Sequence, residues 1–180
     1  MTRDNIPTSS NLTLKNVRLS FPQLFQPKSV MGSEPKYSAA FLLEKSDPQV
    51  AETRKAIAAL TTAKWGKVIP RALKVCLHDG GEKEFDGYED SFYISANSAK
   101  RPLVLDRDRR PLSVDDGIPY AGCFVNGLVR LWAQDNQFGK RVNAELLGVQ
   151  FVRDGEPFGG GKPATPEDFE DLGADEEPIL

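Results

Sequence analysis

Alternation of apolar and polar residues is the dominant pattern along the chain, and it predicts strands. In residues 12–21 (LTLKNVRLSF) the alternation has one slip near Asn16, which indicates a bulged strand. A long loop is predicted after it, punctuated by Pro22, Pro27, Gly32 and Pro35. Further strands are predicted at 36–45, 72–77, 91–96, 102–106, 123–134 and 140–154. A hairpin loop at 135–139 joins the last two, which are the longest.

One segment, residues 47–66, has the pattern of a helix instead. Asp47 is suited to the N-cap and Pro48 to the first helical position. Gly66 is suited to the position just after the helix ends. The side chains predicted to face the core are Val50, Ile57, Leu60 and the alanines.

A single helix among many strands predicts a mainly β protein. We expect an OB-fold-like antiparallel β-barrel with an extended hairpin and a disordered acidic tail. The expected organisation is a flexible N-terminus at 1–11, the barrel domain at 12–154, a Gly/Pro-rich linker at 155–166 and the acidic tail at 167–180.

The distribution of charge changes this picture more than the net charge of −3 does. Residues 161–180 carry one base and seven acids, so they have a net charge of −6. The remaining residues carry 22 bases against 19 acids, a net charge of +3. A basic body joined to an acidic tail predicts a body that binds an anion and a tail that competes for that site or recruits a partner.

The residues needed for catalysis or metal binding are scarce, so we expect neither an enzyme nor a cofactor. The one histidine, His78, is expected to be structural, because too few metal ligands accompany it. Residues 159–162 (GGGK) lack the spacing and the preceding strand of a phosphate loop. The acidic stretch 79–90 lacks calcium-loop spacing and is interpreted as a solvated loop. Cys76 and Cys123 are expected to be free, buried thiols.

Cations interleaved with aromatic residues are the positive chemical signal. Residues 53–78 contain six bases and no acid, with Trp65 among them. Single-stranded nucleic acid needs this mixture, because cations neutralise phosphates and aromatic faces stack unpaired bases. The candidate nucleic-acid-binding residues are Lys64, Trp65, Lys67, Arg71, Tyr93, Lys100, Arg101, Arg107, Arg109, Arg130, Trp132, Lys140 and Arg141.

Several of these residues have a structural alternative. Trp65, at the end of the helix, can equally fill the core, and Trp132 has the position of a barrel residue. Phe92 and Tyr93 point to opposite faces of one strand, so at most one of them faces a ligand there. The basic clusters can also be ordinary solvated surface.

The acidic tail carries a second signal at its end. A tethered polyanion can occupy a basic groove until DNA displaces it. The apolar residues after the acids are suited to anchoring the tail in a basic-rimmed pocket of a partner. The residues assigned to the tail's autoinhibitory and partner-binding roles are Glu167, Asp168, Glu170, Asp171, Asp175, Glu176, Glu177, Ile179 and Leu180.

The motifs together resemble a family of tailed-phage replication proteins that bind single-stranded DNA. DEEPIL is similar to the acidic tips of bacterial single-stranded DNA-binding proteins, with Leu180 where phenylalanine is usual. The body resembles the phage family in RLSFPQLFQPK, EPKYSAAFLLEK, KWGKVIP, LHDGGEK, ISANSAKRP and GVQFVRDGEPFGGGKP. The resemblance implies an OB-fold, binding with little sequence preference, an acidic tail, and contacts with the replicative polymerase or helicase. It also implies a monomer or a homodimer.

We therefore expect a phage single-stranded DNA-binding protein of replication and recombination, which coats and protects single strands. The alternatives are an RNA-binding OB protein and a protein–protein adaptor that works through its acidic tail. No stretch approaches the ~20 apolar residues of a membrane span. The first eleven residues lack the apolar region of a secretion signal. The expected location is the cytoplasm of the infected bacterial host.

Overall fold

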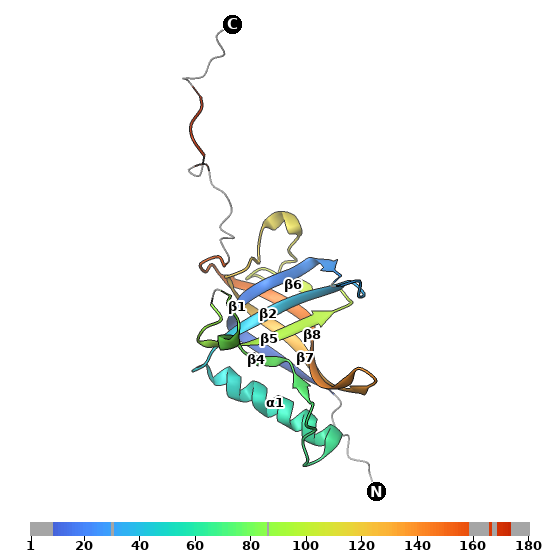
Figure 1. Cartoon of the computed structure of the whole chain (residues 1–180). Coiled ribbons are helices and arrows are strands. Elements are labelled where there is room, and N and C mark those ends of the chain that lie inside the picture. The colour runs from blue at the N-terminus through green and yellow to red at the C-terminus, as the bar shows by residue number, and fades with distance from the viewer. Residues whose placement is uncertain (1–8, 30, 86, 159–165, 167–168, 174–180) are drawn as a thin grey trace.

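The computed structural model describes residues 9–29, 31–85, 87–158, 166 and 169–173. Five strands form a closed barrel in the order β1 (Ser9–Lys28), β2 (Lys36–Glu44), β5 (Ser91–Ser98), β8 (Gly139–Arg153) and β7 (Phe124–Asn136), with β7 returning to β1. Neighbouring strands are antiparallel except β5 and β8, which pair in parallel at Asn97 and Glu145 and so close the barrel (Figure 1). The predicted OB-fold-like barrel is confirmed.

Short elements are attached to this barrel around the β5–β8 pairing. β3 (Lys74–Val75) runs parallel to β8, and β4 (Leu77–Asp79) runs antiparallel to β5. β6 (Leu103–Leu105) pairs with β8 farther along the strand. Two short 3₁₀ helices, η1 (Gly80–Glu82) and η2 (Val114–Asp116), lie in the connecting loops. The single strand predicted at 72–77 is therefore wrong, because the chain passes from β8 to β5 at Cys76.

The first strand is longer than its pattern predicts. It begins at Ser9 and continues to Lys28, so the prediction that a loop starts at Pro22 is wrong. Beyond Arg18 the strand pairs only with β2, and its register shifts on either side of Gln23. A proline is tolerated in such a one-sided, irregular strand because no ladder bond needs its missing N–H. The bulge predicted near Asn16 is confirmed by a register shift between Leu14 and Val17.

Inward-facing side chains of all five strands fill the barrel. Phe41 of β2 lies at the centre of the core, fully buried, beside Ile94 of β5. Its ring lies directly over Gly127 of β7: a Cβ added there would come within 2.6 Å of the ring. The core therefore requires glycine at this position for space, since a larger residue would displace the ring.

Helix α1 (Pro48–Trp65) lies across one end of the barrel (Figure 1). Its predicted ends are confirmed: Asp47 accepts a hydrogen bond from the Gln49 N–H at 2.9 Å, and Gly66 is the C-cap. The helix buries Val50, Ile57 and Leu60 as predicted, together with Thr53 and Thr61. The prediction that its alanines line the buried stripe is wrong for Ala51, Ala58 and Ala59, which are exposed. The threonines take that place because each hydroxyl donates to the carbonyl four residues earlier.

The β7–β8 hairpin is extended, and its strands reach Asn136 and Gly139. The hairpin loop is therefore the two residues 137–138, shorter than the predicted 135–139. The hairpin projects below the barrel in Figure 1.

Residues 155–158, predicted as the start of a linker, pack against the barrel. Arg18 donates to the carbonyl of Glu156 at 2.6 Å and lies 4.0 Å from the centre of the Phe158 ring. The N–H of Phe158 donates to the Ala121 carbonyl at 3.1 Å. Flexibility is also predicted for parts of the N-terminus, the linker and the tail that lie outside the described residues. These parts are residues 1–8, 159–165, 167–168 and 174–180.

Both cysteines are free and buried, as predicted. Burial raises the pKa of each thiol to about 11. The described residues contain no helix long and apolar enough to cross a membrane.

The contact between Phe41 and Gly127 gives a test of the core. Gly127→Ala should lower the free energy of unfolding by about 1–3 kcal/mol, because the added methyl group overpacks the barrel. Phe41→Leu removes the ring that the methyl group meets. In a double-mutant cycle measured by chemical denaturation, the double variant should be less destabilised than the sum of the single variants. Additive losses would show that the ring does not limit the space at Gly127.

Candidate nucleic-acid interface

The pairing of β2 with β5 determines which side chains cover the outside of the barrel wall. Phe41 and Ile94 are opposite each other and both point inward. Because side chains alternate along a strand, the pairs Leu42–Tyr93, Ala40–Ser95 and Ser38–Asn97 point outward. Tyr93 is thus the member of the Phe92–Tyr93 pair that faces the outside, while Phe92 packs against the core.

An aromatic cluster lies on this outer face, made of Phe21, His78, Phe85, Tyr88 and Tyr93. The rings of His78 and Tyr93 stack with centroids 4.9 Å apart, and Tyr88 lies 5.1 Å from Tyr93. Phe85 lies 5.5 Å from Tyr88, and Phe21 meets Phe85 edge-on at 4.9 Å. The cluster brings together β1, β4, β5 and the loop after η1.

The cluster combines an anchored member with exposed ones. Tyr88 is buried, and its hydroxyl donates to the Ser20 hydroxyl at 2.9 Å, which ties the loop to β1. Phe21 and Phe85 are 55% and 47% exposed. Exposed aromatic faces held by a buried ring are suited to stacking against a flat ligand, because their positions are fixed before it binds.

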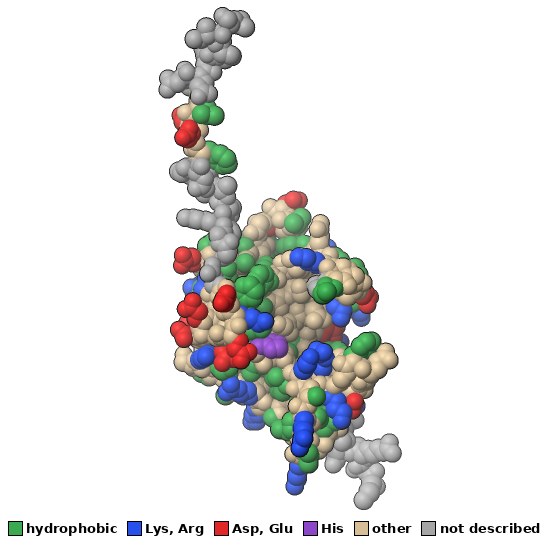
Figure 2. Space-filling model, viewed as in Figure 1, with side chains coloured by type: hydrophobic (Ala, Val, Ile, Leu, Met, Phe, Trp, Pro, Cys, Tyr) green, Lys and Arg blue, Asp and Glu red, His purple; other side chains and the backbone are tan. Residues whose placement is uncertain are grey.

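A groove runs from this cluster across β5. One cavity of about 310 Å³ is lined by aromatic-cluster residues together with Lys83, Ser95 and Asn97. A second, of about 470 Å³, lies between β5, β8 and β3–β4 and is lined by Lys74, Arg141, Ser95 and Asn97. Ser95 and Asn97 line both cavities, so the two lie next to each other on β5, and together they are here called the β5 groove. In Figure 2 the imidazole of His78 lies near the middle of this face, with Asp and Glu side chains on one side of it and Lys or Arg side chains on the other.

The β5 groove has cations at both ends and polar side chains between them. Lys83 lies at the aromatic end, and Lys74 and Arg141 lie at the other. The described part of the chain contains two ion pairs, Lys45–Asp79 and Arg130–Glu145, and neither uses these three cations. Their charges are therefore available to an anion such as a phosphate backbone.

The structure brings some of the predicted site residues to the groove. Tyr93 belongs to the aromatic cluster and Arg141 lines the basic end. Lys140 precedes Arg141 at the start of β8. Lys100 and Arg101 lie two and three residues after the end of β5 and outside the lining of both cavities, and the Arg101 guanidinium lies 5.9 Å from the Phe25 ring centre.

Other predicted residues lie elsewhere. Arg130 and Trp132 point outward from β7, which is separated from β2 and β5 by one strand on each side. Arg130 is paired with Glu145, and Trp132 lies opposite Asn143 and Ser9. Arg107 and Arg109 lie on the turn after β6, where Arg107 donates to the Val152 carbonyl at 2.9 Å.

The predicted residues of the acid-free segment lie at the end of α1 and in the loop to β3. Trp65 packs against the core, and its indole N–H donates to Asp135 at 3.0 Å, linking the helix to the β7–β8 hairpin. This supports the structural alternative for Trp65. Lys64, Lys67 and Arg71 are exposed beside it.

Sequence reasoning missed most of the aromatic cluster and two of the groove cations. Phe85 and Tyr88 belong to the acidic stretch 79–90, which was interpreted as solvated loop, although Tyr88 is buried. The presence of two aromatic residues in this acidic stretch was the sequence signal that it packs against the barrel. Lys74 and Lys83 are not among the predicted site residues, because nothing local in the sequence shows that they lie at opposite ends of one groove.

This five-stranded OB-fold-like barrel carries exposed aromatic rings and cations on its β2–β5 face, and OB-folds as a class bind oligonucleotides and oligosaccharides. A family model described as "Enterobacter phage Enc34, ssDNA-binding protein" matches residues 10–179. The chain therefore belongs to the Enc34 phage ssDNA-binding protein family.

Individual relatives agree with this assignment. Putative protein p50 of Acyrthosiphon pisum secondary endosymbiont phage 1 is 45% identical, over 94% of this chain and 98% of that protein. The solved structure of the single-stranded DNA-binding protein from bacteriophage Enc34 in complex with ssDNA has a TM-score of 0.72 and 34% identity, over 83% of this chain and 89% of that one. The bacteriophage T7 single-stranded DNA-binding protein gp2.5 shares the fold, with a TM-score of 0.54 at 14% identity, over 94% of this chain and all of that one.

The histidine in the groove gives a test of its electrostatics. Burial, and then the positive charge of Lys83, lower the pKa of His78 below its ordinary value of 6.5. As the pH falls below 6.5, the unfolded chain takes up a proton before the folded one does, so the free energy of unfolding should decrease. Because the chain has one histidine, an NMR titration of its imidazole reports this site alone.

Lys83→Gln should move the midpoint of that titration upward, toward 6.5. The matched control is Lys28→Gln, which removes an exposed lysine at the end of β1 and should leave the midpoint in place. An unchanged midpoint in Lys83→Gln would show that the lysine does not act on the groove histidine.

Proposed function

We propose that this chain binds single-stranded DNA in the β5 groove, with little sequence preference, and coats and protects exposed single strands during phage replication and recombination. The observation that carries the proposal is the aromatic cluster next to cations without ion-pair partners among the described residues, on the β2–β5 face. Its membership of a phage ssDNA-binding family supports the same function.

The cations of the groove hold the phosphate backbone. Lys74 and Arg141 at one end and Lys83 at the other define a path along which a strand lies across β5. Each neutralised phosphate releases counterions, so the logarithm of affinity should fall with the logarithm of salt concentration, by about 0.7 per phosphate. Lys100, Arg101 and Lys140 extend this path beyond the ends of the groove.

The aromatic cluster supplies the preference for single strands. A base must be unpaired before its face can lie on Phe21 or Phe85, so a duplex cannot make this contact. Stacking is tolerant of sequence, because every base has a flat face. Binding to single strands alone also shifts the melting equilibrium and removes hairpins by mass action.

The acidic tail competes with DNA for the β5 groove within the same molecule, and it also binds partner proteins. Its seven acids give it the charge of a short polyanion, and the tether keeps it at a local concentration of roughly millimolar. It weakens adventitious binding and yields to DNA, which carries more charge. The freed tail then contacts replication or recombination proteins in the cytoplasm of the infected host. The protein itself acts by binding, without catalysis.

The aromatic contact predicts a difference between two exposed rings. Phe85→Ala should weaken binding to an oligo-dT by about 1–3 kcal/mol, or roughly fivefold to 150-fold, through loss of one stacked base. Trp132→Ala removes a ring that is 37% exposed on β7 and should leave the affinity near its original value. Both affinities are measured by fluorescence anisotropy after the thermal midpoints are compared. An equal loss in the two variants would remove the β5 groove as the binding site.

The function itself is tested by titrating labelled oligo-dT with the full chain and with a chain ending at Pro163. We expect tight, salt-sensitive binding that duplex DNA displaces poorly, and stronger binding without the tail. Equal affinity for the two chains would leave the tail as a partner hook only. Preference for a ribo-oligomer competitor would favour the RNA-binding alternative, since the 2′-hydroxyl distinguishes the two. Absence of binding by both chains would leave the adaptor function.

A further inference from the structure

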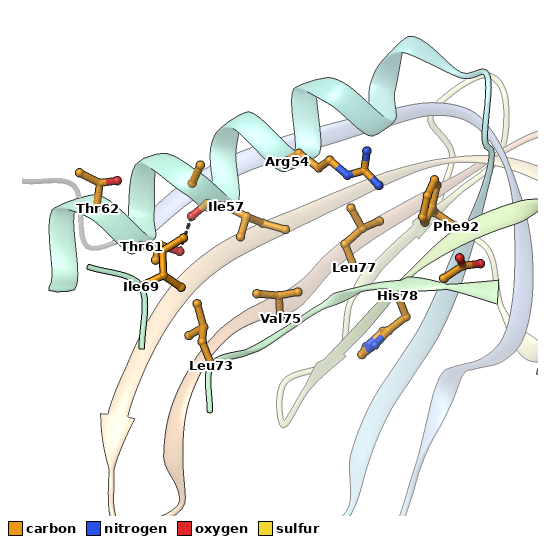
Figure 3. A pocket seen from close by; sticks show the side chains of 12 residues that line it. Arg54, Ile57, Thr61, Thr62, Ile69, Leu73, Val75, Leu77, His78 and Phe92 are labelled. Carbon is orange, nitrogen blue, oxygen red and sulfur yellow. Dashed lines mark hydrogen bonds between the residues drawn. The ribbon is translucent and has the colours of Figure 1, made fainter. Parts of the chain in front are cut away.

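A second cavity, separate from the β5 groove, lies between α1 and the β3–β4 segment. This α1 pocket has a volume of about 380 Å³, within the range of small ligand sites. Its lining includes Ile57 and Thr61 of the helix, Ile69 and Leu73 of the loop, and Val75 and Leu77 of the strands. In Figure 3, Leu73, Val75 and Leu77 point toward the helix, whereas His78 points to the other side of β4.

The α1 pocket is apolar inside and open to solvent. Thr61 does not make the interior polar, because its hydroxyl donates to the Ile57 carbonyl at 2.8 Å. Ile69 lines the pocket and remains 66% exposed. Contiguous apolar surface left in water is typical of a docking site rather than of a finished core.

The segment that builds this apolar interior is rich in positive charge. The pocket is built almost entirely from residues 53–78, the segment that contains six bases and no acid. Arg54 is the one cation in the lining, and its guanidinium lies 4.7 Å from the centre of the Phe92 ring. The one acid in the lining, Asp79, is paired with Lys45 at 3.3 Å. An occupant should therefore be apolar at its tip and acidic beside it.

The chain itself contains a segment with this chemistry. Residues 175–180 (DEEPIL) place three acids directly before Pro178, Ile179 and Leu180. The groove cations can attract the acids, but the aliphatic side chains of the β5 groove are only alanines and the valines Val75 and Val142, beside polar and aromatic ones. The α1 pocket supplies an aliphatic recess for the two branched side chains, within the segment rich in positive charge.

We propose that Ile179 and Leu180 dock in the α1 pocket while Asp175, Glu176 and Glu177 lie against the cations of residues 53–78. The docked segment then lies beside the β5 groove, because Val75 and His78 line both cavities. Docking at this place gives the acidic tail a fixed position from which it opposes DNA. The inference rests on the proposed function for this competition, but not for the docking itself.

The chain between the barrel and the docking segment is long enough to reach the pocket. The packed part of the chain ends at Phe158, and Ile179 lies 21 residues later. At about 3.3 Å per residue the intervening segment spans up to roughly 70 Å when extended. A domain of this length has a diameter of roughly 40 Å. The segment can therefore reach the far end of its own barrel, and the same pocket on a second copy is reached in the same way.

Photocrosslinking of the full chain tests the docking directly. Leu180→p-benzoylphenylalanine keeps the tip apolar and marks whatever it touches. We expect crosslinks to residues 54–62 and 69–77, located by mass spectrometry. Crosslinks to β5 residues instead, or an absence of crosslinks within the protein, would overturn the proposal. Mixing isotopically light and heavy chains shows whether the pocket belongs to the same chain or to a second copy.

DNA affinity tests the consequence with a matched pair of variants. Ile69→Glu places a carboxylate in the α1 pocket, whereas Val68→Glu makes the same charge change at the adjacent residue, which is 82% exposed and outside the lining. In the full chain, Ile69→Glu should bind oligo-dT roughly three- to tenfold more tightly than Val68→Glu, because the tethered competitor is released.

The two pocket-side variants are also compared in a chain that carries Ile179→Ser and Leu180→Ser. There the difference between Ile69→Glu and Val68→Glu should disappear. A difference that persists without the apolar tip, or no difference with it, would overturn the link between docking and competition. If none of the chains binds DNA, the proposed function fails, and the crosslinks alone decide whether the tip docks.

Discussion

The pairing between β5 and β8 is the constraint on which the rest of the molecule depends. The two strands meet in parallel at one residue pair, Asn97 and Glu145, and this contact closes the barrel. On one side of it β3 pairs with β8, and on the other side β6 does. The strands diverge where β3 and β4 enter, and the basic end of the β5 groove lies in that gap. Closing the barrel and forming the groove are therefore consequences of the same short contact.

The segment that fills this gap has a different role on each side. Lys74 lines the β5 groove and Leu77 lines the α1 pocket, whereas Val75 and His78 line both. Because side chains alternate along extended chain, one short stretch of backbone forms the wall between an aqueous groove and an apolar pocket. A ligand in either cavity touches the same stretch, which gives the two cavities a physical connection without any large movement.

Local pattern was sufficient for most of the fold. Alternation located the barrel strands, and the capping residues Asp47 and Gly66 located both ends of the helix. It failed where pairing, rather than composition, determines structure. Pro22 predicts a loop, but it lies in β1 because only one side of the strand is paired there. The helix alanines read as core, but Thr53 and Thr61 occupy the buried face because their hydroxyls bond to the helix backbone.

The site was less predictable than the fold, for a related reason. Tyr93 and Arg141, which line the β5 groove, could be predicted as candidates because each lies in a strand with a clear pattern. Phe21 and Phe85 are 64 residues apart in the sequence and meet only after β1 and the loop following η1 have folded together. Charge and aromaticity along the chain therefore indicate the kind of ligand, whereas the location of the site depends on how the strands pair in the sheet.

The short β5–β8 contact also makes the barrel wall unequal in stiffness. β2 and β5 are joined along eight successive residue pairs, from Tyr37 with Ser98 to Glu44 with Ser91, whereas one pair joins β5 to β8. A wall deforms most easily where the fewest hydrogen bonds must stretch. We therefore expect the largest fluctuations in strand separation between β5 and β8, beneath the groove. A groove laid over the most easily deformed part of the wall can adjust its width, so the proposed tolerance of purines and pyrimidines alike would follow from the mechanics of the fold.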